Sequence, residues 1–273
     1  MTDRRRALVA LTAFTLLACA APAARAQTDF YNTDRGRPLA TEDAVVIERR
    51  AFELQAAPLT FQRVMRGVSH WGIAPELAWG FAPRTQVEVA LPIAVEDDGT
   101  RPRALVAAAG LEIELLHQLN TESTTLPAFA LGAGVHLPLG PLAPSRAVPT
   151  VRALLTRTLG WGRVHLNGNY SPGDDLAPGD AGAMESSRWQ AGLAVDHTFA
   201  LRSVLVGAEV VARAPLVADG STEWRSAVGV RQQVSPRLAM DAGLGRRVSA
   251  GEAGWTFTMG AAYAFAPPGM PGF

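Results

Sequence analysis

The chain of 273 residues carries 25 Lys and Arg against 25 Asp and Glu, so its formal net charge at pH 7 is zero. All basic residues are arginine and are spread along the chain, which argues against nucleic acid as a partner. The single cysteine, Cys19, lies near the N-terminus. Removal of an N-terminal signal would therefore leave no thiol for a disulfide, a thiolate nucleophile or a zinc cluster.

The N-terminus has the order of a secretory signal peptide. Arg4-Arg5-Arg6 precedes an apolar run from Ala7 to about Ala18, and Ala24-Arg25-Ala26 offers small residues for cleavage. We expect residues 1–26 to be a cleaved signal peptide that exports the chain. One alternative is open, because Leu16-Leu17-Ala18-Cys19 resembles a lipobox that would make Cys19 a lipidated first residue.

Residues 27–43 are polar, contain glycine and proline, and show no strand periodicity. They predict either a periplasmic leader or a short plug inside the structure that follows. In a plug, Arg35 and Arg37 would meet inward carboxylates such as Glu76 and Glu88.

From residue 44 onward, large apolar residues alternate with small or polar ones in segments that are separated by turn residues. No apolar stretch after the signal reaches the ~18 residues of a membrane helix. Twelve such segments predict an all-β protein, a transmembrane antiparallel up-and-down barrel of about 12 strands over residues 44–265, with both termini in the periplasm. The expected strands are 45–63, 70–81, 86–95, 104–119, 125–138, 149–159, 163–171, 188–199, 202–213, 222–233, 237–247 and 255–265.

Connections between these segments alternate in length, as expected for periplasmic turns and extracellular loops. Gly160-Trp161-Gly162 and Ser235-Pro236 are short, whereas 139–148 and 172–187 are longer and rich in Gly, Pro, Asp and Ser. Single glycines within the strands are expected where a barrel curves or where side chains crowd inside it. They are Gly168, Gly207, Gly229, Gly243, Gly245 and Gly260.

The last strand ends in a pattern that resembles the C-terminal β-signal, by which the outer-membrane barrel-assembly machinery recognises its substrates. The pattern consists of Thr258, Gly260, Tyr263 and Phe265. It makes that machinery an expected partner. Residues 266–273 follow the signal and contain three prolines, so we expect a short periplasmic tail rather than a strand.

Aromatic residues lie near strand ends and about eight to ten residues apart on one face. A soluble β-sandwich, the alternative considered, would place them mid-strand in a core, whereas a membrane barrel places them at the two interfaces. The pattern predicts contact with outer-membrane lipid. The expected interface aromatics are Trp71, Trp79, Phe81, Trp189, Phe199, Trp255, Tyr263 and Phe265.

The opposite strand face carries carboxylates and guanidiniums together. Inside a barrel these groups must be hydrated or paired, so they predict either a water-filled pore or a network of ion pairs across the lumen. Small residues in the same rows, such as Ala90 and Gly132, favour a pore. The candidate lumen-lining residues are Glu76, Glu88, Glu112, Glu114, Arg163, His165, Arg188, Asp196, Glu209, Arg225, Arg231 and Asp241.

The sequence gives little support for an enzyme. In outer-membrane phospholipases a histidine is followed two residues later by a nucleophilic serine, but Asn167 occupies that position after His165, and none of the other four histidines has such a serine. HExxH, CxxC and phosphate-binding glycine motifs are absent from the sequence. We expect no catalytic residue, no metal and no cofactor.

The chain resembles the outer-membrane barrel family named after the meta-pathway of phenol degradation. The resemblance is carried by 29–38, by the hairpin Pro75–Gly80 to Arg84–Val89, and by Gly260–Phe265. It implies a channel or transporter for passive passage of small solutes across the bacterial outer membrane. The alternatives are a structural barrel with a closed, ion-paired lumen and, third, a lipid-modifying enzyme.

Overall fold

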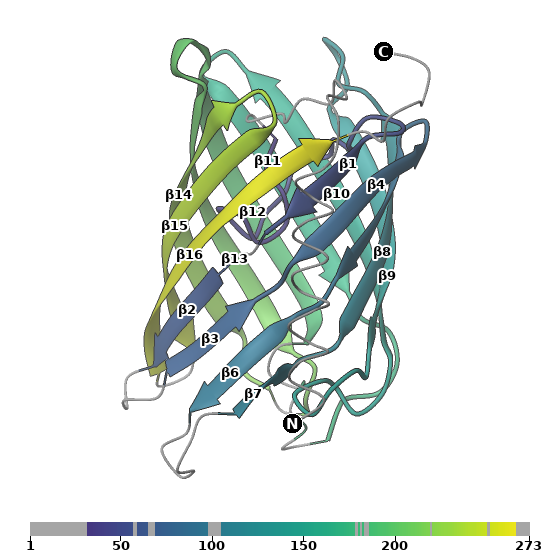
Figure 1. The fold of residues 1–273 in the computed structure, drawn as a ribbon, viewed down its shortest axis with the longest axis vertical. Helices are drawn as coiled ribbons and strands as arrows, with labels where there is room; N and C mark the ends of the chain where they lie inside the picture. Colours follow the sequence, from purple (N-terminus) through teal and green to yellow (C-terminus); the bar gives the residue numbers. More distant parts are fainter. Residues whose placement is uncertain are drawn as a thin grey trace, which may run out of the picture.

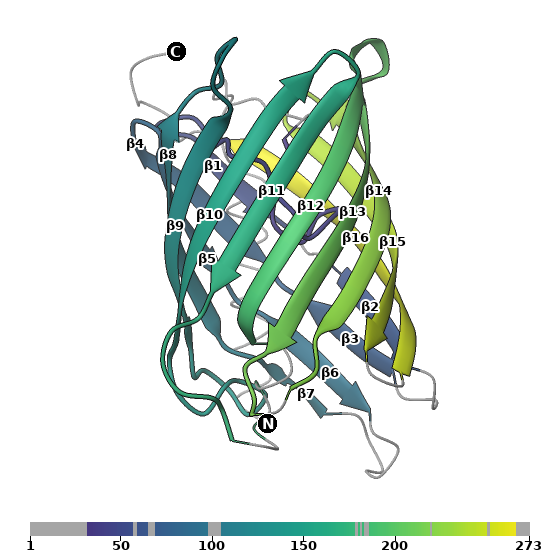
Figure 2. The same cartoon turned by 180° about the vertical axis from the view of Figure 1, so that it is seen from behind.

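The computed structural model describes residues 32–56, 59–64, 69–97, 105–177, 180, 182, 186–218, 220–249 and 252–265. Within these ranges, sixteen strand segments form one sheet that closes into a barrel (Figure 1, Figure 2). The segments are β1 (Phe52–Gln55), β2 (Leu59–Val64), β3 (Ser69–Ile73), β4 (Glu76–Ala82), β5 (Thr85–Ala90), β6 (Ile93–Asp97), β7 (Leu105–Ala108), β8 (Leu111–Asn120), β9 (Ala128–Leu137), β10 (Val148–Leu159), β11 (Gly162–Tyr170), β12 (Ser187–Phe199), β13 (Val204–Pro215), β14 (Glu223–Ser235), β15 (Leu238–Ser249) and β16 (Glu252–Phe265).

These segments amount to twelve membrane strands. β1 and β2 follow each other and both pair with β16, so together they are the first strand and close the barrel. In the same way β3 and β4, β5 and β6, and β7 and β8 are consecutive halves of single strands. Every neighbouring pair is antiparallel, which confirms the predicted twelve-stranded barrel.

The halved strands lie side by side, and their breaks have local causes. Pro75 and Pro92 lack the backbone N–H that a ladder needs, and Gly110 has φ +126°, which only glycine adopts without strain. Backbone hydrogen bonds join neighbouring strands at three of these breaks, since the Leu91 N–H donates to the Pro75 carbonyl at 3.0 Å and the Ala109 N–H donates to the Pro92 carbonyl at 2.8 Å.

The first strand begins later than predicted, at Phe52 instead of near residue 45. Before it the chain turns, with the Ala51 N–H donating to the Glu48 carbonyl at 3.0 Å and Arg50 at φ 70°. This turn lies directly against Gly80 of β4, and a Cβ added at Gly80 would overlap the Glu48 carbonyl. Residues 45–51 therefore belong to the segment inside the barrel, a placement that apolar alternation does not reveal.

The outer face of the barrel is apolar and carries aromatic groups at its rims. Phe52 stacks between Trp79 and Phe265, with ring centroids 5.7 and 5.5 Å away. Phe61 and Trp71 form another pair at 4.4 Å. All eight predicted interface aromatics are exposed or half-buried on this face, as lipid contact requires. Phe52 joins the belt although the sequence pattern did not single it out.

The longer loops pack over one end of the barrel. Val148, Leu176 and Leu216 form a buried apolar cluster there, and the Leu176 N–H donates to the Leu216 carbonyl at 2.9 Å. Among the described residues, no helix is both long and apolar enough to cross a membrane. The predicted signal peptide 1–26, Cys19, the first residues of 27–43 and the tail 266–273 lie outside the described residues.

Candidate functional site: a lumen occupied by an inner segment

Residues 32–51, referred to below as the inner segment, lie within the barrel (Figure 1, purple). From Arg37 onward the segment follows the inner wall from strand to strand. Its successive contacts are with Asp241 of β15, Glu209 of β13, Asn167 of β11, Thr156 of β10 and Gln86 of β5. The segment thus runs around the lumen and not straight along its axis.

Irregular backbone inside a barrel has unpaired N–H groups, and the wall supplies acceptors for them. Glu209 accepts from the N–H groups of Ala40, at 2.9 Å, and Thr41, at 2.8 Å. The Glu42 N–H donates to Asn167 Oδ1 at 2.8 Å. Asn167 also donates through Nδ2 to the Glu42 carbonyl at 2.8 Å, so this one side chain bonds both the N–H and the carbonyl of Glu42.

A row of glycines makes room for the segment. Gly207, Gly229 and Gly243 lie directly opposite one another on β13, β14 and β15. A Cβ on Gly229 would lie 2.6 Å from the Cβ of Pro38, and one on Gly207 would lie 3.0 Å from a methyl of Leu39. The three positions form a smooth groove in which Pro38 and Leu39 are seated. Of the six single glycines singled out in the sequence, these three mark where the segment approaches the wall.

Arg37 is the most deeply buried anchor, with 0% of its side chain exposed. Its guanidinium donates to Asp241 Oδ2 at 2.8 Å, to Asp34 Oδ2 at 2.6 Å and to Gln55 Oε1 at 3.1 Å. Asp34 is also paired with Arg231 of β14. A buried guanidinium is stable only with such partners, so these contacts fix the register of the segment on the wall.

Two further ion pairs and one bridging arginine complete the network. Glu42 accepts from Arg152 of β10 at 2.6 Å, and Asp43 pairs with Arg163 of β11 at 3.2 Å. Arg35 reaches the other side of the lumen, where its guanidinium donates to Glu112 at 2.6 Å and lies 3.5 Å from Glu114. The charges of the segment are thus matched by the charges of the wall.

The partners of Arg35 and Arg37 differ from those predicted. Glu76 and Glu88 were expected to meet these arginines, but no ion pair of either glutamate is found among the described residues. Both carboxylates are buried, at 8% and 7% exposure, and Glu88 accepts a hydrogen bond from Gln86 at 2.5 Å. The reason is register, since the segment passes β4 and β5 with residues 47–50 and not with Arg35 or Arg37.

The twelve predicted lumen residues fall into two groups. Eight are less than a tenth exposed, and the other four have side-chain exposures of 14–32%. Arg188 is the outlying member, because it reaches Asp175 in a loop. The buried eight are Glu76, Glu88, Glu114, His165, Asp196, Glu209, Arg231 and Asp241, and the other four are Glu112, Arg163, Arg188 and Arg225.

Part of the space that small residues leave in the lumen is filled. Ala44 and Val46 of the inner segment pack with Leu116, Ala128 and Ala130 in a buried apolar cluster. Those alanines, expected to widen a pore, instead receive side chains of the segment.

A hydroxyl, an imidazole and a carboxylate are connected beneath the segment. Thr156 Oγ1 lies 2.9 Å from His165 Nδ1, and His165 Nε2 lies 2.9 Å from Asp196 Oδ2. Such an order suits nucleophilic catalysis only where substrate reaches the hydroxyl. Thr156 is 3% exposed and its oxygen accepts the Ala44 N–H at 2.8 Å, so the array serves to hold the segment. The sequence pattern missed Thr156 because its partner lies on a neighbouring strand.

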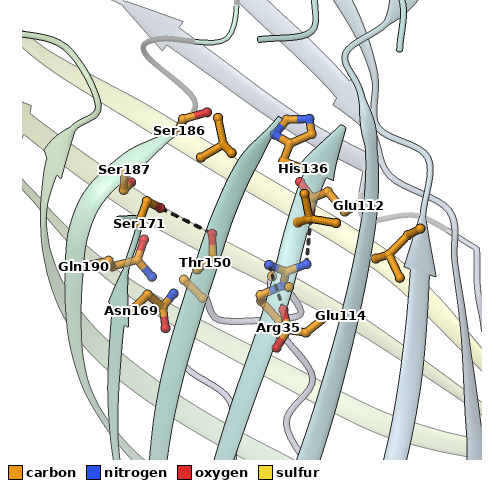
Figure 3. Close-up of a pocket in the computed structure, with 16 residues that line it drawn as sticks. Arg35, Glu112, Glu114, His136, Thr150, Asn169, Ser171, Ser186, Ser187 and Gln190 are labelled. Carbon is orange, nitrogen blue, oxygen red and sulfur yellow. Dashed lines mark hydrogen bonds and ion pairs between the residues drawn. The ribbon is translucent and has the colours of Figure 1, made fainter. Parts of the chain in front are cut away.

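A cavity of about 230 Å³ lies beside Arg35 (Figure 3). One side is formed by Arg35 with Glu112 and Glu114, and the other by uncharged polar groups of β10, β11 and β12. Within the described chain, no group of three or more His, Cys, Asp or Glu is arranged to hold a metal ion.

Solved outer-membrane proteins share this fold at low sequence identity. The COG4313 outer membrane channel from Pseudomonas putida F1 matches with a TM-score of 0.57 and 11% identity, over 85% of this chain and 100% of its own. The KdgM porin matches with a TM-score of 0.51 and 11% identity, over 79% of this chain and 99% of its own. Outer membrane phospholipase A from Escherichia coli, at 0.43 and 8% identity, is too distant to bear on activity.

No protein-family model matches the sequence, and no curated protein is significantly similar to it. The resemblance to the phenol meta-pathway family is therefore supported only as far as the architecture goes. The chain has the fold of a twelve-stranded outer-membrane barrel, shared with proteins that are channels.

Proposed function

We propose that the protein is a non-enzymatic outer-membrane channel for passive passage of small solutes, whose lumen is narrowed by the inner segment. The observation that carries this proposal is the polar cavity beside Arg35, which leaves room between the segment and the wall. The likeness to channel proteins supports the same role. Export by the signal at 1–26 and assembly through Thr258, Gly260, Tyr263 and Phe265 belong to the proposal.

The closed structural barrel is the second candidate, and the buried ion pairs of Arg37 and Arg152 favour it. The two candidates differ in whether ions pass while the segment is in place. A deletion of residues 32–47 distinguishes the contribution of the segment from that of the barrel, because it removes the anchors and leaves the strands intact.

The test is conductance in a planar lipid bilayer of the refolded chain from Gln27, compared with the deletion variant. We expect small, reproducible steps from the full chain and larger ones from the variant. If the chain from Gln27 shows no conductance steps although heat-modifiable migration shows that it is folded, the open channel is rejected. Large steps from the deletion alone would then assign closure to the segment.

A further inference from the structure

The cavity beside Arg35 has the properties of a binding site. It lies at the long-loop end of the barrel, between Arg35 and Gly36 of the inner segment and the inner face of β8–β12 (Figure 3). We propose that it binds a small, uncharged, polyhydroxylated solute of about the size of one sugar ring. As the substrate class of the channel, this inference rests on the proposed function, whereas binding itself does not.

Two buried polar atoms at the cavity have no hydrogen-bond partner within the part of the chain that the structure describes. Asn169 Oδ1 and Ser186 Oγ are inaccessible to solvent and make no hydrogen bond with the described residues. Ser186 as a whole is only 8% exposed. Buried polar groups are bonded in the great majority of cases, and an orphaned one signals a missing partner. Both residues line the cavity, so rotation of the side chain would bring either oxygen to its surface. There a ligand with hydroxyl groups would supply a donor to Asn169 and either role to Ser186.

Neighbouring groups extend this uncharged polar surface. Gln190 lies directly opposite Asn169 across β11 and β12, and Ser187 borders the same side. Thr150 and Ser171 lie 3.3 Å apart, and either hydroxyl can be the donor (Figure 3). Amides and hydroxyls both donate and accept, so the surface matches the mixed character of a polyol.

The charged side of the cavity is already compensated. Arg35 is bound by Glu112 and lies near Glu114, and Glu114 also pairs with Arg152. An anion or a cation would lose hydration without gaining an unpaired counter-charge, which disfavours both. Uncharged solutes do not meet this cost.

Two further features suit an uncharged guest. His136 Nε2 lies 2.8 Å from the Ala109 carbonyl, which can only accept, so this nitrogen carries a hydrogen that is already bonded and does not offer it to an anion. Gly134 lies between Glu114 and Thr150 in one row of the wall, and the missing side chain there keeps the hollow open. The volume is below the roughly 300–1,000 Å³ of sites for drug-sized ligands, which limits the guest to a small molecule.

The test compares three pyranose probes that differ mainly in charge: D-glucose, D-glucuronate and D-glucosamine. Saturation-transfer NMR titrations use the refolded chain from Gln27 in lauryldimethylamine oxide, a detergent without a sugar head group. We expect D-glucose to bind at least about tenfold more tightly than either charged probe. Equal or tighter binding of a charged probe, or no glucose signal from folded protein, would overturn the proposal.

Variants assign the signal to the cavity. Asn169→Leu and Gln190→Leu remove the amides at similar size, and each should weaken glucose binding about tenfold. Ser186→Ala removes a hydroxyl that bonds none of the described groups, so it should keep the fold while lowering affinity. Gln232→Leu, on the exposed face of β14, is the matched control and should bind glucose as the parent does. Unchanged binding in all three cavity variants would contradict the site.

Liposome swelling separates the site from the channel. Swelling with D-glucose that is lost in Asn169→Leu supports the cavity as part of the path. Glucose binding without any swelling would support the site and reject passive transport. Swelling that all three cavity variants retain, together with no glucose binding by NMR, would reject the site and support the channel.

Discussion

Two parts of the inner segment, residues 37–44 and Arg35, are held in different ways. Residues 37–44 lie against β10–β15 through buried ion pairs, backbone hydrogen bonds and the glycine groove. Arg35 instead crosses to β8 with a side chain that is 31% exposed, and it borders the cavity. The contrast indicates that the first region fixes the segment in the barrel, whereas the Arg35 contact is the part that can yield without release of the rest.

The largest effect should come from filling the glycine groove. In Gly229→Val the new side chain would overlap Pro38, whose ring cannot move aside without displacing the backbone. We expect displacement of residues 37–44 and a several-fold rise in single-channel conductance. Gly168→Val is the control, because a Cβ there meets nothing within 4 Å. An unchanged conductance in Gly229→Val would mean that the segment is not what narrows the lumen.

Loss of the buried anchor should come next. Arg37→Met leaves Asp34 and Asp241 with less compensation in a buried site, and removal of one partner of such a pair costs about 3–5 kcal/mol. We expect weaker docking, measured as faster tryptic cleavage after Arg35 than in the parent. Arg84→Met, on an exposed turn, should leave that rate unaltered. Equal cleavage rates in Arg37→Met and the parent would contradict the role of Arg37 as the main anchor.

A single backbone hydrogen bond should matter less. Thr156→Val conserves shape but removes the acceptor of the Ala44 N–H, and leaving a buried donor unpaired costs about 1–3 kcal/mol. Amide hydrogen exchange at Ala44 should accelerate while the strands stay protected. Thr158→Val in the same strand, at an exposed turn, is the control. Exchange at Ala44 that matches the parent would show that this bond does not hold the segment.

The smallest effect on docking is expected at Arg35. Half-exposed ion pairs contribute about 0.2–1 kcal/mol, so Arg35→Gln should leave the segment in place. Removal of the positive charge beside Glu112 and Glu114 should still shift the reversal potential under a salt gradient toward cation selectivity. Arg202→Gln, exposed between β12 and β13, should not shift it. Release of the segment in Arg35→Gln would contradict the distinction between Arg35 and residues 37–44.

Period-two alternation predicted the fold, since a strand that separates lipid from an interior must place its side chains on opposite faces. It failed at residues 45–51, which begin with three apolar residues but belong to the inner segment and not to the wall. The alternation also could not show that Arg35 pairs with Glu112 and not with Glu76. Ion pairs across a lumen depend on the height at which the segment passes each strand, and periodicity contains no information on that height.

The sequence by itself determined the barrel, its number of strands and which strand faces point outward, because those properties follow from local periodicity and from where the aromatics lie along each strand. Only the tertiary structure decided the interior. Gly207, Gly229 and Gly243 are unremarkable singly and become a groove when the strand register sets them side by side. Arg37 pairs with Asp241, which lies 204 residues further along the chain. The cavity lies where the segment leaves space beside the inner wall of β8–β12, and the side-chain oxygens of Asn169 and Ser186 there have no hydrogen-bond partner among the described residues.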